Sequence, residues 1–475
     1  MARPTREEFE AILDLISGEA RAYLNTIDER PLRVPDADER AAAFASPLPE
    51  EGDGAATALH ELLKEGLEAS VASSGPRFFH FVQGGVTPAA LGADWLTTIL
   101  DQNPGMWVAT PLGNGLAEVS VAWLLDLFGL PAGWGGALTT GATMANLTAL
   151  GAARRWWGQR HGVDVDREGL AGLSPVPVLT GGYVHPSVRK ALSILGLGRE
   201  RVGVFAKDDA GRVDLIGLAA ALRDLDGAPA ILVGNAGEVN TGDFDPIADL
   251  ADLAEEHDAW LHVDGAFGLF AAASPRTAHL VEGVARAHSV ISDGHKWLNV
   301  PYDCGFAFVR EPSLLHGAFA SSAAYLAADD DPRAHLDRVS PQMSQRARAL
   351  TVWATLRAYG RGGYREMVER HLDLAQRVAG RVDSAPELER LAEVPLNIVC
   401  FRYHPLGVDD EETLNDLNRG LGDAVLRDGR VYVGTTTYRG RVAFRPAIVN
   451  WRTRPEDVDL LVDVIRELGA DLHSS

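Results

Sequence analysis

Cysteine is scarce in this chain of 475 residues, which contains only Cys304 and Cys400. Two cysteines are too few for a disulfide framework or for a zinc site built from thiolates, so small disulfide-stapled folds are excluded. The 14 histidines show no HExxH or comparable spacing, and we therefore expect no metal site.

The chain also lacks long apolar runs. No uninterrupted apolar segment approaches the roughly 18–20 residues that a membrane-spanning helix requires. Residues 1–10 carry positive charges without a following apolar core, which argues against a signal peptide. Together with the shortage of cysteine, these absences predict a cytoplasmic, reducing location and no membrane partner.

Basic residues are the third deficit, since 44 Lys and Arg stand against 66 Asp and Glu and the net charge is −22. Such a surface repels nucleic acid, so we expect no nucleic-acid partner. The net charge leaves the substrate open, because local charge in a pocket can oppose the global sign.

What remains is the composition of a globular protein, with 46% hydrophobic and 23% charged residues. The length exceeds what one compact core accommodates. We expect an N-terminal helical extension (1–75), a large domain (76–340) and a small C-terminal domain (341–475). The amphipathic helices predicted over 5–25 and 57–70 cannot bury their apolar faces alone, so they must pack on the main body or on a partner subunit.

Within the large domain, short apolar strands alternate with helical segments such as 215–225 and 248–257. This pattern predicts an α/β fold with a mostly parallel sheet and helices on both faces. In such sheets the ligand binds outside the carboxyl ends of the strands. The strands are predicted at 177–180, 201–205, 230–234, 259–264 and 289–292.

The C-terminal part begins after a loop predicted over 315–340. A helix over 344–359 is expected to end at Gly360, in a glycine-rich stretch that is a good C-terminal signal. The remaining elements, which predict a smaller α+β domain, are a helix over 364–383, strands near 396–403, 430–435 and 441–448, and a closing helix over 455–469.

The most informative segment is Ser292–Trp297, where Lys296 stands between His295 and Trp297 just after a predicted strand. Asp264 ends the preceding predicted strand. A pyridoxal phosphate enzyme needs a lysine whose amine forms a Schiff base with the cofactor and a carboxylate that keeps the pyridine nitrogen protonated. Either residue alone is better explained as a surface lysine or a buried structural acid. Together with the motifs below, the pair predicts pyridoxal phosphate as the cofactor.

A second motif, Gly136–Leu147, has small residues leading directly into a helical pattern. A helix N-terminus offers free N–H groups and the positive end of a dipole, which bind phosphate. Gly141 and Ala142 permit close approach, and the hydroxyl of Thr140 or Thr143 can donate to phosphate oxygens. The same residues alone would be an ordinary helix cap; the downstream lysine favours the phosphate site.

Two further segments follow predicted strands. His185 is placed to stack on a flat cofactor, although a histidine at a helix start is also common as a cap or a solvated side chain. In Asn240–Ile247 a turn leads into a helix, for which we predict Asp245 as the N-cap. The loop 237–241 can still face the cofactor ring.

With these motifs assembled, the chain resembles the pyridoxal phosphate-dependent amino acid decarboxylase superfamily of aromatic amino acid, glutamate and diaminobutyrate decarboxylases. The resemblance covers nearly the whole length and continues through Ser344–Leu350 and Trp353. It implies the fold-type I aminotransferase-like architecture and an obligate homodimer with active sites at the subunit interface. It also implies decarboxylation of an L-amino acid: exchange of Lys296 for the substrate amine in the Schiff base, loss of CO2, and protonation of the carbanion.

The resemblance assigns roles to individual residues. Lys296 would carry the Schiff base, Asp264 would pair with the pyridine nitrogen, and His185 and Ala266 would lie on opposite faces of the ring. The residues implied around the phosphate and the Schiff base are Thr140, Gly141, Ala142, Thr143, Asn146, Ser292 and His295.

The sequence departs from the family at two places. Gly237-Glu238-Val239 stands where the family usually has Gly-Thr-Thr, which puts a carboxyl group near the cofactor. The family's loop tyrosine, which protonates the carbanion, has no counterpart in residues 333–338. Tyr325 lies earlier in the loop and is not assigned this role. His335 can act as the acid, because its ordinary pKa suits proton transfer near neutrality, or it is a solvated loop histidine.

These departures leave alternatives to a simple decarboxylase open. An unprotonated carbanion can react with oxygen and give an aldehyde, so oxidative deamination with or without CO2 loss is one alternative. A biosynthetic lyase or transferase reaction is another, whereas retention of Lys296 and Asp264 opposes a role as an inactive scaffold. Four aromatic residues favour an aromatic substrate unless they serve only as core or interface; these are Phe79, Phe81, Trp95 and Trp107. For Arg445 we favour pairing with a structural acid over binding of a substrate carboxylate.

Overall fold

The computed structural model describes residues 5–320, 333 and 335–474. These divide into two compact units. The smaller unit comprises Met1–Gln83, Gln376–Ala392 and Val399–Ser475, and the larger one Gly84–Ala375 and Glu393–Ile398. No helix among the described residues is long and apolar enough to cross a membrane.

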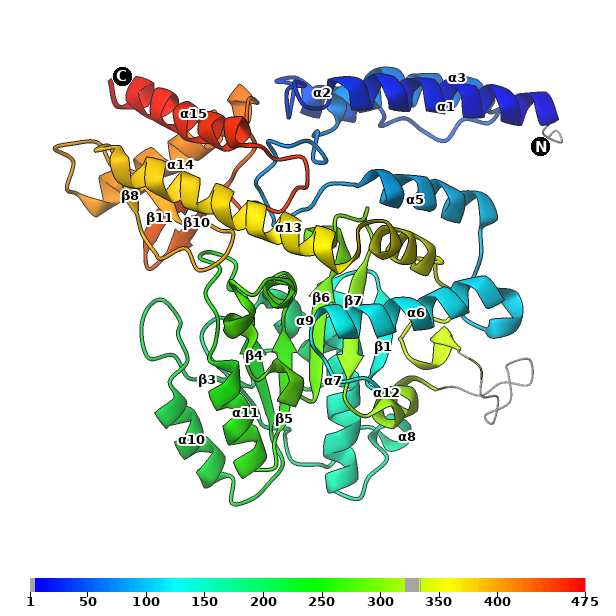
Figure 1. Cartoon of the computed structure of the whole chain (residues 1–475), viewed down its shortest axis with the longest axis vertical. Coiled ribbons are helices and arrows are strands. Elements are labelled where there is room, and N and C mark those ends of the chain that lie inside the picture. Colours follow the sequence, from blue (N-terminus) through cyan, green and yellow to red (C-terminus); the bar gives the residue numbers. More distant parts are fainter. Residues whose placement is uncertain (1–4, 321–332, 334, 475) are drawn as a thin grey trace. The chain divides into compact units, whose positions relative to one another are not determined.

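The larger unit is built on a mixed sheet (Figure 1), which has seven strands in the described part of the chain. The central strands run parallel, whereas β7 is antiparallel to both β1 and β6. In sheet order the strands are β1 (Gly135–Thr139), β7 (Gly305–Val309), β6 (Ser289–Asp293), β5 (Trp260–Asp264), β4 (Ile231–Asn235), β2 (Val178–Thr180) and β3 (Val202–Val204).

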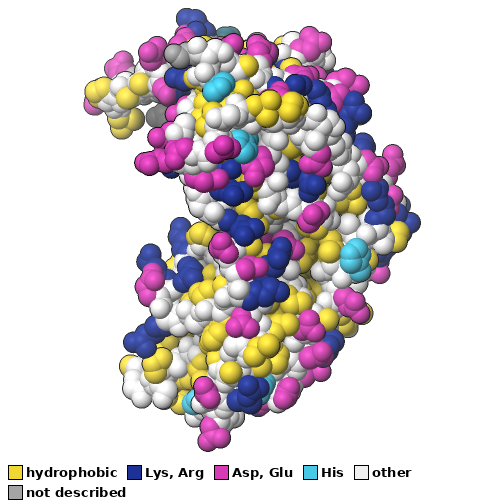
Figure 2. All heavy atoms as spheres, turned by 90° about the vertical axis from the view of Figure 1, so that its left-hand side faces the viewer, with side chains coloured by type: hydrophobic (Ala, Val, Ile, Leu, Met, Phe, Trp, Pro, Cys, Tyr) yellow, Lys and Arg dark blue, Asp and Glu magenta, His cyan; other side chains and the backbone are white. Residues whose placement is uncertain are grey.

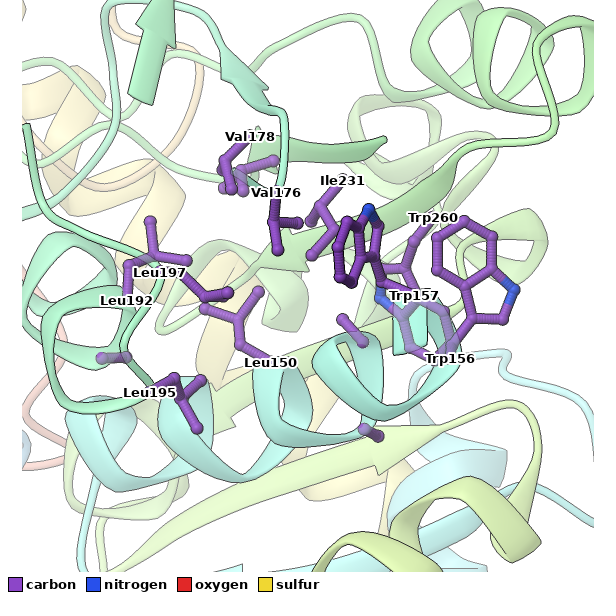
Figure 3. Packing of buried hydrophobic residues seen from close by; sticks show 14 of the residues in the cluster. Leu150, Trp156, Trp157, Val176, Val178, Leu192, Leu195, Leu197, Ile231 and Trp260 are labelled. Atoms are coloured by element: carbon purple, nitrogen blue, oxygen red, sulfur yellow. The ribbon is translucent and has the colours of Figure 1, made fainter. Parts of the chain in front are cut away.

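Helices cover both faces of this sheet. Alternate residues of a strand point to opposite faces, and Ile231 and Val233 of β4 pack in one apolar cluster with Trp156 and Trp157 of α7 (Ala142–Arg160). Figure 3 shows these indoles beside Trp260 of β5. The opposite face of β4 meets α11 (Ile247–Glu256), whose Leu250 and Ile247 crowd Gly234. Other helices of the unit are α5 (Pro88–Leu100), α6 (Pro111–Leu127), α8 (Val165–Glu168), α9 (Pro186–Ile194), α10 (Leu215–Asp224), α12 (Pro312–Phe319) and, up to Ala375, α13 (Ala349–Ser384).

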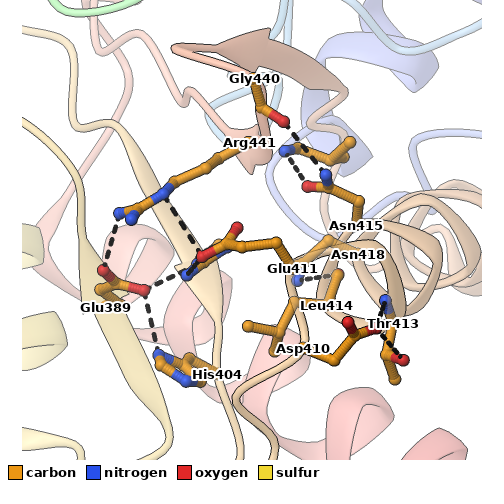
Figure 4. Close-up of polar contacts among 12 residues, drawn as sticks. Glu389, His404, Asp410, Glu411, Thr413, Leu414, Asn415, Asn418, Gly440 and Arg441 are labelled. Atoms are coloured by element: carbon orange, nitrogen blue, oxygen red, sulfur yellow. Dashed lines mark hydrogen bonds and ion pairs between the residues drawn. The ribbon is translucent and has the colours of Figure 1, made fainter.

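The smaller unit contains an antiparallel sheet in the order β10 (Thr435–Tyr438), β11 (Arg441–Phe444), β9 (Phe401–Tyr403) and β8 (Leu388–Arg390). A charged cluster joins this sheet to α14 (Glu411–Asp428), as Figure 4 shows for Glu389, Glu411 and Arg441. The buried Arg402 guanidinium pairs with the same two carboxylates. Other helices of this unit are α1 (Arg6–Thr26), α2 (Ala37–Ala42), α3 (Ala55–Glu61), α4 (Leu67–Ala69) and α15 (Pro455–Ser474).

The predicted α/β class, with its mostly parallel sheet and covered faces, is confirmed, and the predicted strands correspond to β2 through β6. Strands β1 and β7 were not predicted. The strand expected at 430–435 is wrong, because β10 begins only at Thr435. The expected loop over 315–340 is wrong at its start, since α12 continues to Phe319. Residues 321–332 and 334, which include Tyr325, lie outside the described residues.

Two helix boundaries also differ from expectation. The helix expected from residue 344 starts instead at Ala349, whereas its expected end at Gly360 is confirmed, because the non-helical backbone of Gly360 (φ 58°, ψ −177°) divides α13 (Ala349–Ser384) into two helical segments. Asp245 is not an N-cap: α11 is capped by Pro246 without a side-chain hydrogen bond. Instead, Asp245 turns inward, and its Oδ2 accepts a hydrogen bond from Asn235 N at 2.9 Å.

Candidate active site

A cavity of about 490 Å³ opens at the carboxyl ends of the central strands, where Asn235, Asp264 and Asp293 end β4, β5 and β6. Its walls come from the larger unit alone. The first turns of α7 and α9 and the segment after β6 point into it. This is the edge at which a parallel sheet is expected to bind its ligand.

The N-terminus of α7 forms one wall of the cavity. Gly141 is its N-cap, with φ of 140° and no side-chain cap hydrogen bond, so the first N–H groups of the helix are not satisfied by a capping side chain. A Cβ on Gly141 would lie 2.9 Å from His295 Cε1. Only glycine therefore fits between the helix start and the imidazole. Thr140, Ala142 and Thr143 line the cavity beside it, and the whole forms a cradle for an anion.

Lys296 lies in a short π-helical turn, Gly294–Leu298, and its own backbone is not helical (φ −96°, ψ −106°). Its Nζ is 3.2 Å from Asp293 Oδ2, and His295 Nε2 is 3.5 Å from the same oxygen. Burial lowers the pKa of His295, an effect that the Asp293 carboxylate opposes. Gly84 packs on this turn so closely that a Cβ there would lie 1.9 Å from Lys296 O. The amine is thus presented to the cavity from a fixed backbone.

Asp264 is buried on the floor of the cavity. Its Oδ1 accepts a hydrogen bond from Ala266 N at 3.1 Å, and its Oδ2 accepts one from Asn146 Nδ2 at 2.9 Å. Each oxygen keeps acceptor capacity for a further donor. A ring N–H is the kind of donor that this carboxylate suits.

His185 enters the cavity as the N-cap of α9. Its Nδ1 accepts a hydrogen bond from Ser187 N at 3.2 Å and lies 2.7 Å from Ser187 Oγ. These contacts fix the orientation of the imidazole at the mouth of the sheet.

The Glu238 carboxyl group, the departure noted in the sequence, lines the cavity but is engaged by its own loop. Its oxygens accept hydrogen bonds from the backbone N–H groups of Asn240 and Thr241, each at 2.9 Å, and from both of their side chains. Nearby, Tyr183 donates its hydroxyl to Asp243 Oδ2 at 2.7 Å. Burial, followed by this hydrogen bond, raises the pKa of Tyr183.

Most residues expected in the site meet in this one cavity. Asn146 and Ser292 do not line it: Asn146 lies beneath Asp264, and Ser292 Oγ donates to Ala266 O at 3.5 Å. The expected residues that line the cavity are Thr140, Gly141, Ala142, Thr143, His185, Asp264, Ala266, His295 and Lys296.

His335 is not among the lining residues of this cavity. It borders a separate, more apolar cavity of about 540 Å³ with Glu118 of α6 and Trp134 before β1. The aromatic residues that suggested an aromatic substrate, Phe79, Phe81, Trp95 and Trp107, do not line the first cavity either. Within one chain, neither expectation is supported by the position of its residues.

Sequence reasoning gave no role to several residues that do line the cavity. Asp293 stands in the recognised lysine motif, and its position at the end of β6 could have identified it. Asn235 similarly ends β4. Phe267, whose ring centroid is 5.8 Å from Lys296 Nζ, carried no signal in the sequence.

The residues present fit pyridoxal phosphate. The uncapped start of α7 suits its phosphate, the Lys296 amine its aldehyde, and the Asp264 carboxylate its ring nitrogen. Two buried oxygens in the cavity wall, Asn235 Oδ1 and Asp293 Oδ1, have no hydrogen-bond partner among the described residues. A polar ligand in the cavity would supply partners to such atoms.

Comparison with known proteins agrees with this chemistry. The family model described as the pyridoxal-dependent decarboxylase conserved domain matches residues 44–404. L-2,4-diaminobutyrate decarboxylase of Rhizobium meliloti (strain 1021) is 32% identical over 437 residues, covering 90% of this chain and 85% of that protein. Aromatic-L-amino-acid decarboxylase of Bacillus atrophaeus is 26% identical over 460 residues, with 95% and 94% covered. The crystal structure of Oryza sativa TDC with PLP and tryptamine has a TM-score of 0.91 at 23% identity, covering 99% of this chain and 100% of that one.

Proposed function

The chain belongs to the pyridoxal-dependent decarboxylase family, and from that premise we propose what its residues do in the decarboxylation of an L-amino acid. The protein is a pyridoxal phosphate-dependent carboxy-lyase, and the expected fold-type I architecture is confirmed. The roles of the site residues, the substrate and the assembly are the subject of the proposal.

One observation carries the assignment of roles: Lys296, Asp264 and the uncapped N-terminus of α7 line the same cavity. When bound, pyridoxal phosphate supplies an aldehyde that condenses with amines and a ring that accepts the electron pair left by CO2. In our proposal the N–H groups at the start of α7 bind the phosphate, with the Thr140 and Thr143 hydroxyls as further donors.

The other residues act on the ring and on protons. Asp264 holds a proton on the ring nitrogen, which keeps the ring a strong electron acceptor. Lys296 Nζ would be the amine that holds the cofactor through its aldehyde, because it is the amine that lines the cavity beside the start of α7. Asp293, 3.2 Å from Nζ, is placed to hold the ammonium group. His185 and Ala266 orient the ring from its two faces, and Ser292 and His295 support the lysine turn.

We propose a homodimer as the working form. Two features support it: α1 has no buried residue, and α5 exposes a row of apolar side chains. His335 keeps its proposed role as the acid only if a second copy supplies it, because within one chain it borders a different cavity. A cytoplasmic location is also proposed; Cys304 and Cys400 are both buried and form no disulfide, which suits a reducing compartment. The functional division at residues 75/76 and 340/341 likewise stays a prediction.

The decisive experiment is a mass-spectrometric product profile with oxygen uptake recorded in parallel. The panel holds aromatic, acidic and cationic L-amino acids, since the relatives named above include both aromatic and diaminobutyrate decarboxylases. Formation of one amine and CO2 without oxygen uptake is expected. An aldehyde with oxygen uptake would instead mean that the carbanion is oxidised, and a turnover-free protein would contradict the proposal.

A companion experiment tests Lys296 itself. Borohydride reduction of the loaded protein, followed by peptide mapping, is expected to place the pyridoxyl group on Lys296, and Lys296→Ala to abolish the bound-cofactor absorbance. Lys190→Ala is the matched control, because Lys190 lies on α9 but does not line the cavity. A pyridoxyl group on another lysine would overturn the central assignment.

A further inference from the structure

A chain of buried polar side chains runs beneath the floor of the cavity, from β6 and β5 to α7. Trp260 Nε1 donates to Ser289 Oγ at 2.9 Å, and Ser289 Oγ lies 2.8 Å from His262 Nδ1. His262 Nε2 lies 2.8 Å from Asn146 Oδ1, and Asn146 Nδ2 donates to Asp264 Oδ2 at 2.9 Å. Ser289, His262 and Asn146 are fully buried. Asp264, at one end of these hydrogen bonds, has a role in the proposed function, whereas Asn146, His262, Ser289 and Trp260 have none.

The chemistry of the groups sets the direction of every hydrogen bond in the chain. Asn146 must turn its amide nitrogen to Asp264, because the amide oxygen would face a carboxylate oxygen without a proton between them. The amide oxygen therefore faces His262, whose Nε2 must carry the proton. His262 Nδ1 is then the acceptor of a hydrogen bond that the Ser289 hydroxyl donates, while Ser289 Oγ accepts a hydrogen bond from the Trp260 indole N–H.

A neutral imidazole is consistent with this arrangement. Burial lowers the pKa of His262 to about 4, and the nearby Asp264 carboxylate opposes the shift only in part. At neutral pH His262 thus carries one proton, and its position is fixed by Asn146 on one side and Ser289 on the other.

The chain has a branch that reaches a second cofactor-facing residue. Asn146 Nδ2 also lies 3.2 Å from Ser187 Oγ, and Ser187 Oγ is 2.7 Å from His185 Nδ1. The two protons of one amide group are therefore shared between the carboxylate on the cavity floor and the serine that fixes His185. A single buried side chain thus connects both sides of the site.

We propose that Asn146 is a positioning residue that aligns Asp264 and, through Ser187, His185, with His262 and Ser289 holding its amide in the productive orientation. This replaces the expectation that Asn146 binds the cofactor directly, and it rests on the proposed function of the site. Its consequence is that the proton on the ring nitrogen of bound pyridoxal phosphate depends on a side chain that does not touch the cofactor.

Two substitutions at Asn146 separate a hydrogen-bonding role from a packing role. Asn146→Asp keeps the shape but replaces the donor by an oxygen that faces Asp264, whereas Asn146→Ala removes both shape and donor. If packing alone mattered, Asn146→Asp would resemble the wild type and Asn146→Ala would be worse. Our proposal predicts the opposite order, with Asn146→Asp at least as impaired as Asn146→Ala.

The primary readout is the ¹⁵N NMR shift of ring-labelled pyridoxal phosphate bound to each variant, which reports the ring-nitrogen proton without turnover. We expect the shift of a protonated ring in the wild type and a move toward the unprotonated value in both variants. The affinity of the cofactor-free protein for pyridoxal phosphate should fall about 10- to 100-fold, the scale of one hydrogen bond to a charged group. kcat should fall more than KM rises.

Asn114→Ala is the matched control, since Asn114 is a buried asparagine of the same unit whose amide nitrogen donates to Thr110 O, at the N-cap of its own helix. It should leave the ¹⁵N shift unchanged. A second pair of variants tests the hydrogen bond from His262 to Asn146 even if the Asn146 variants fail to fold. His262→Gln retains a donor near the Nε2 position, and His262→Leu does not. Only His262→Leu should shift the ring signal.

The possible failures are distinguishable. If the wild-type protein does not bind pyridoxal phosphate at Lys296, the proposed function fails. If it binds and turns over while the Asn146 and His262→Leu variants keep the wild-type ¹⁵N shift, the function stands and the positioning role is overturned.

Discussion

At the residue scale, Asp245 shows that a side chain whose neighbours in the sequence suggest a helix cap can instead be buried against another element of the fold. An aspartate before a proline at a helix start is typical of an N-cap, yet this side chain is buried and accepts a hydrogen bond from Asn235 N. Its other oxygen, Oδ1, has no hydrogen-bond partner among the described residues. Burial raises the pKa of Asp245 to about 7, with the Asn235 N–H acting in the opposite direction.

This shift predicts a pH-dependent loss of stability. Between pH 3.8 and about 7, the unfolded chain has released the Asp245 proton while the folded chain retains it. The contribution of this group to stability therefore falls as the pH rises through that window, and the full penalty is present above pH 7. A carboxamide at this position cannot ionise. The free energy of unfolding of the Asp245→Asn variant, relative to that of the wild type, should therefore rise by about 2–3 kcal/mol when the pH is raised from 5 to 8.

The measurement is urea unfolding of both proteins at the two pH values. Asp249→Asn is the control, because Asp249 lies exposed on α11, the helix that follows Asp245. Its difference from the wild type should be the same at pH 5 and pH 8. A constant difference for Asp245→Asn as well would show that the carboxyl is ionised in the fold.

At the element scale, the start of α7 depends on a glycine. Gly141 has a φ of 140°, and a Cβ there would lie 2.9 Å from His295 Cε1. Gly141→Ala should therefore push the helix start or the imidazole out of place and lower the affinity for pyridoxal phosphate at least about tenfold. Fluorescence titration of the cofactor-free variant measures this loss.

Gly162 supplies the matched control for that substitution. It follows the other end of α7, also has a positive φ (69°), and a Cβ there would meet nothing within 4 Å. Gly162→Ala should introduce only the backbone strain, of about 1 kcal/mol, and keep the cofactor affinity. Equal loss of affinity in both variants would mean that general destabilisation, and not the cradle, is responsible.

The charged cluster of the small sheet yields a prediction about stability alone. Arg402 is 2% exposed and pairs with Glu389 and Glu411, whereas Arg441 pairs with the same carboxylates from a side chain 42% exposed. Replacing both glutamates by glutamine leaves a buried guanidinium without a counter-charge and should destabilise by about 3 kcal/mol.

Arg441→Ala removes only the exposed partner and should change stability by less than about 1 kcal/mol. Chemical unfolding, followed by the circular dichroism signal, compares the two variants. A loss in Arg441→Ala as large as that in Glu389→Gln/Glu411→Gln would locate the stabilising charge at the surface and contradict this account.

A helix or strand could be predicted from the sequence where its own residues carry the pattern, and could not where it forms only by pairing with a distant segment. Strands β4, β5 and β6 are buried on both faces, so they stand out as apolar runs. Strand β1 is Gly-Gly-Ala-Leu-Thr, which lacks β-branched residues until its end, and it joins the sheet only by pairing with β7 from far along the chain. No local pattern reports such pairing.

The same distinction holds for the site. Lys296, Asp264 and Gly141 follow or precede strands and helices that the sequence predicts, so the strand ends brought them together as expected. The position of His335 depends on how its segment packs against α6 and β1, and the hydrogen bonds of Asn146 with Asp264 and His262 join residues more than a hundred positions apart. Those features follow from tertiary packing, which spacing along the chain does not encode.

At the scale of the whole molecule, the acidic surface and the exposed apolar residues serve different purposes. Acidic and basic side chains are interspersed with apolar ones over the face that Figure 2 shows. On α5, by contrast, Leu96, Ile99 and Leu100 are 46%, 68% and 39% exposed and share one side of the helix by their spacing. A net charge of −22 opposes non-specific association, so such a row of apolar residues indicates a specific contact.

This argument predicts that the protein is a dimer held in part by α5. Sedimentation analysis should give about twice the 50.9 kDa of one chain for the wild type, and 50.9 kDa for the double variant Leu96→Asp/Ile99→Asp. Decarboxylase activity should be lost together with the dimer if the two copies complete each other's sites, and it should survive if each chain is self-sufficient. Ile216→Asp is the control: Ile216 is 82% exposed on α10, and its replacement should leave the dimer intact. A double variant that still sediments as a dimer would place the contact on another surface, and the unburied face of α1 would be the next to test.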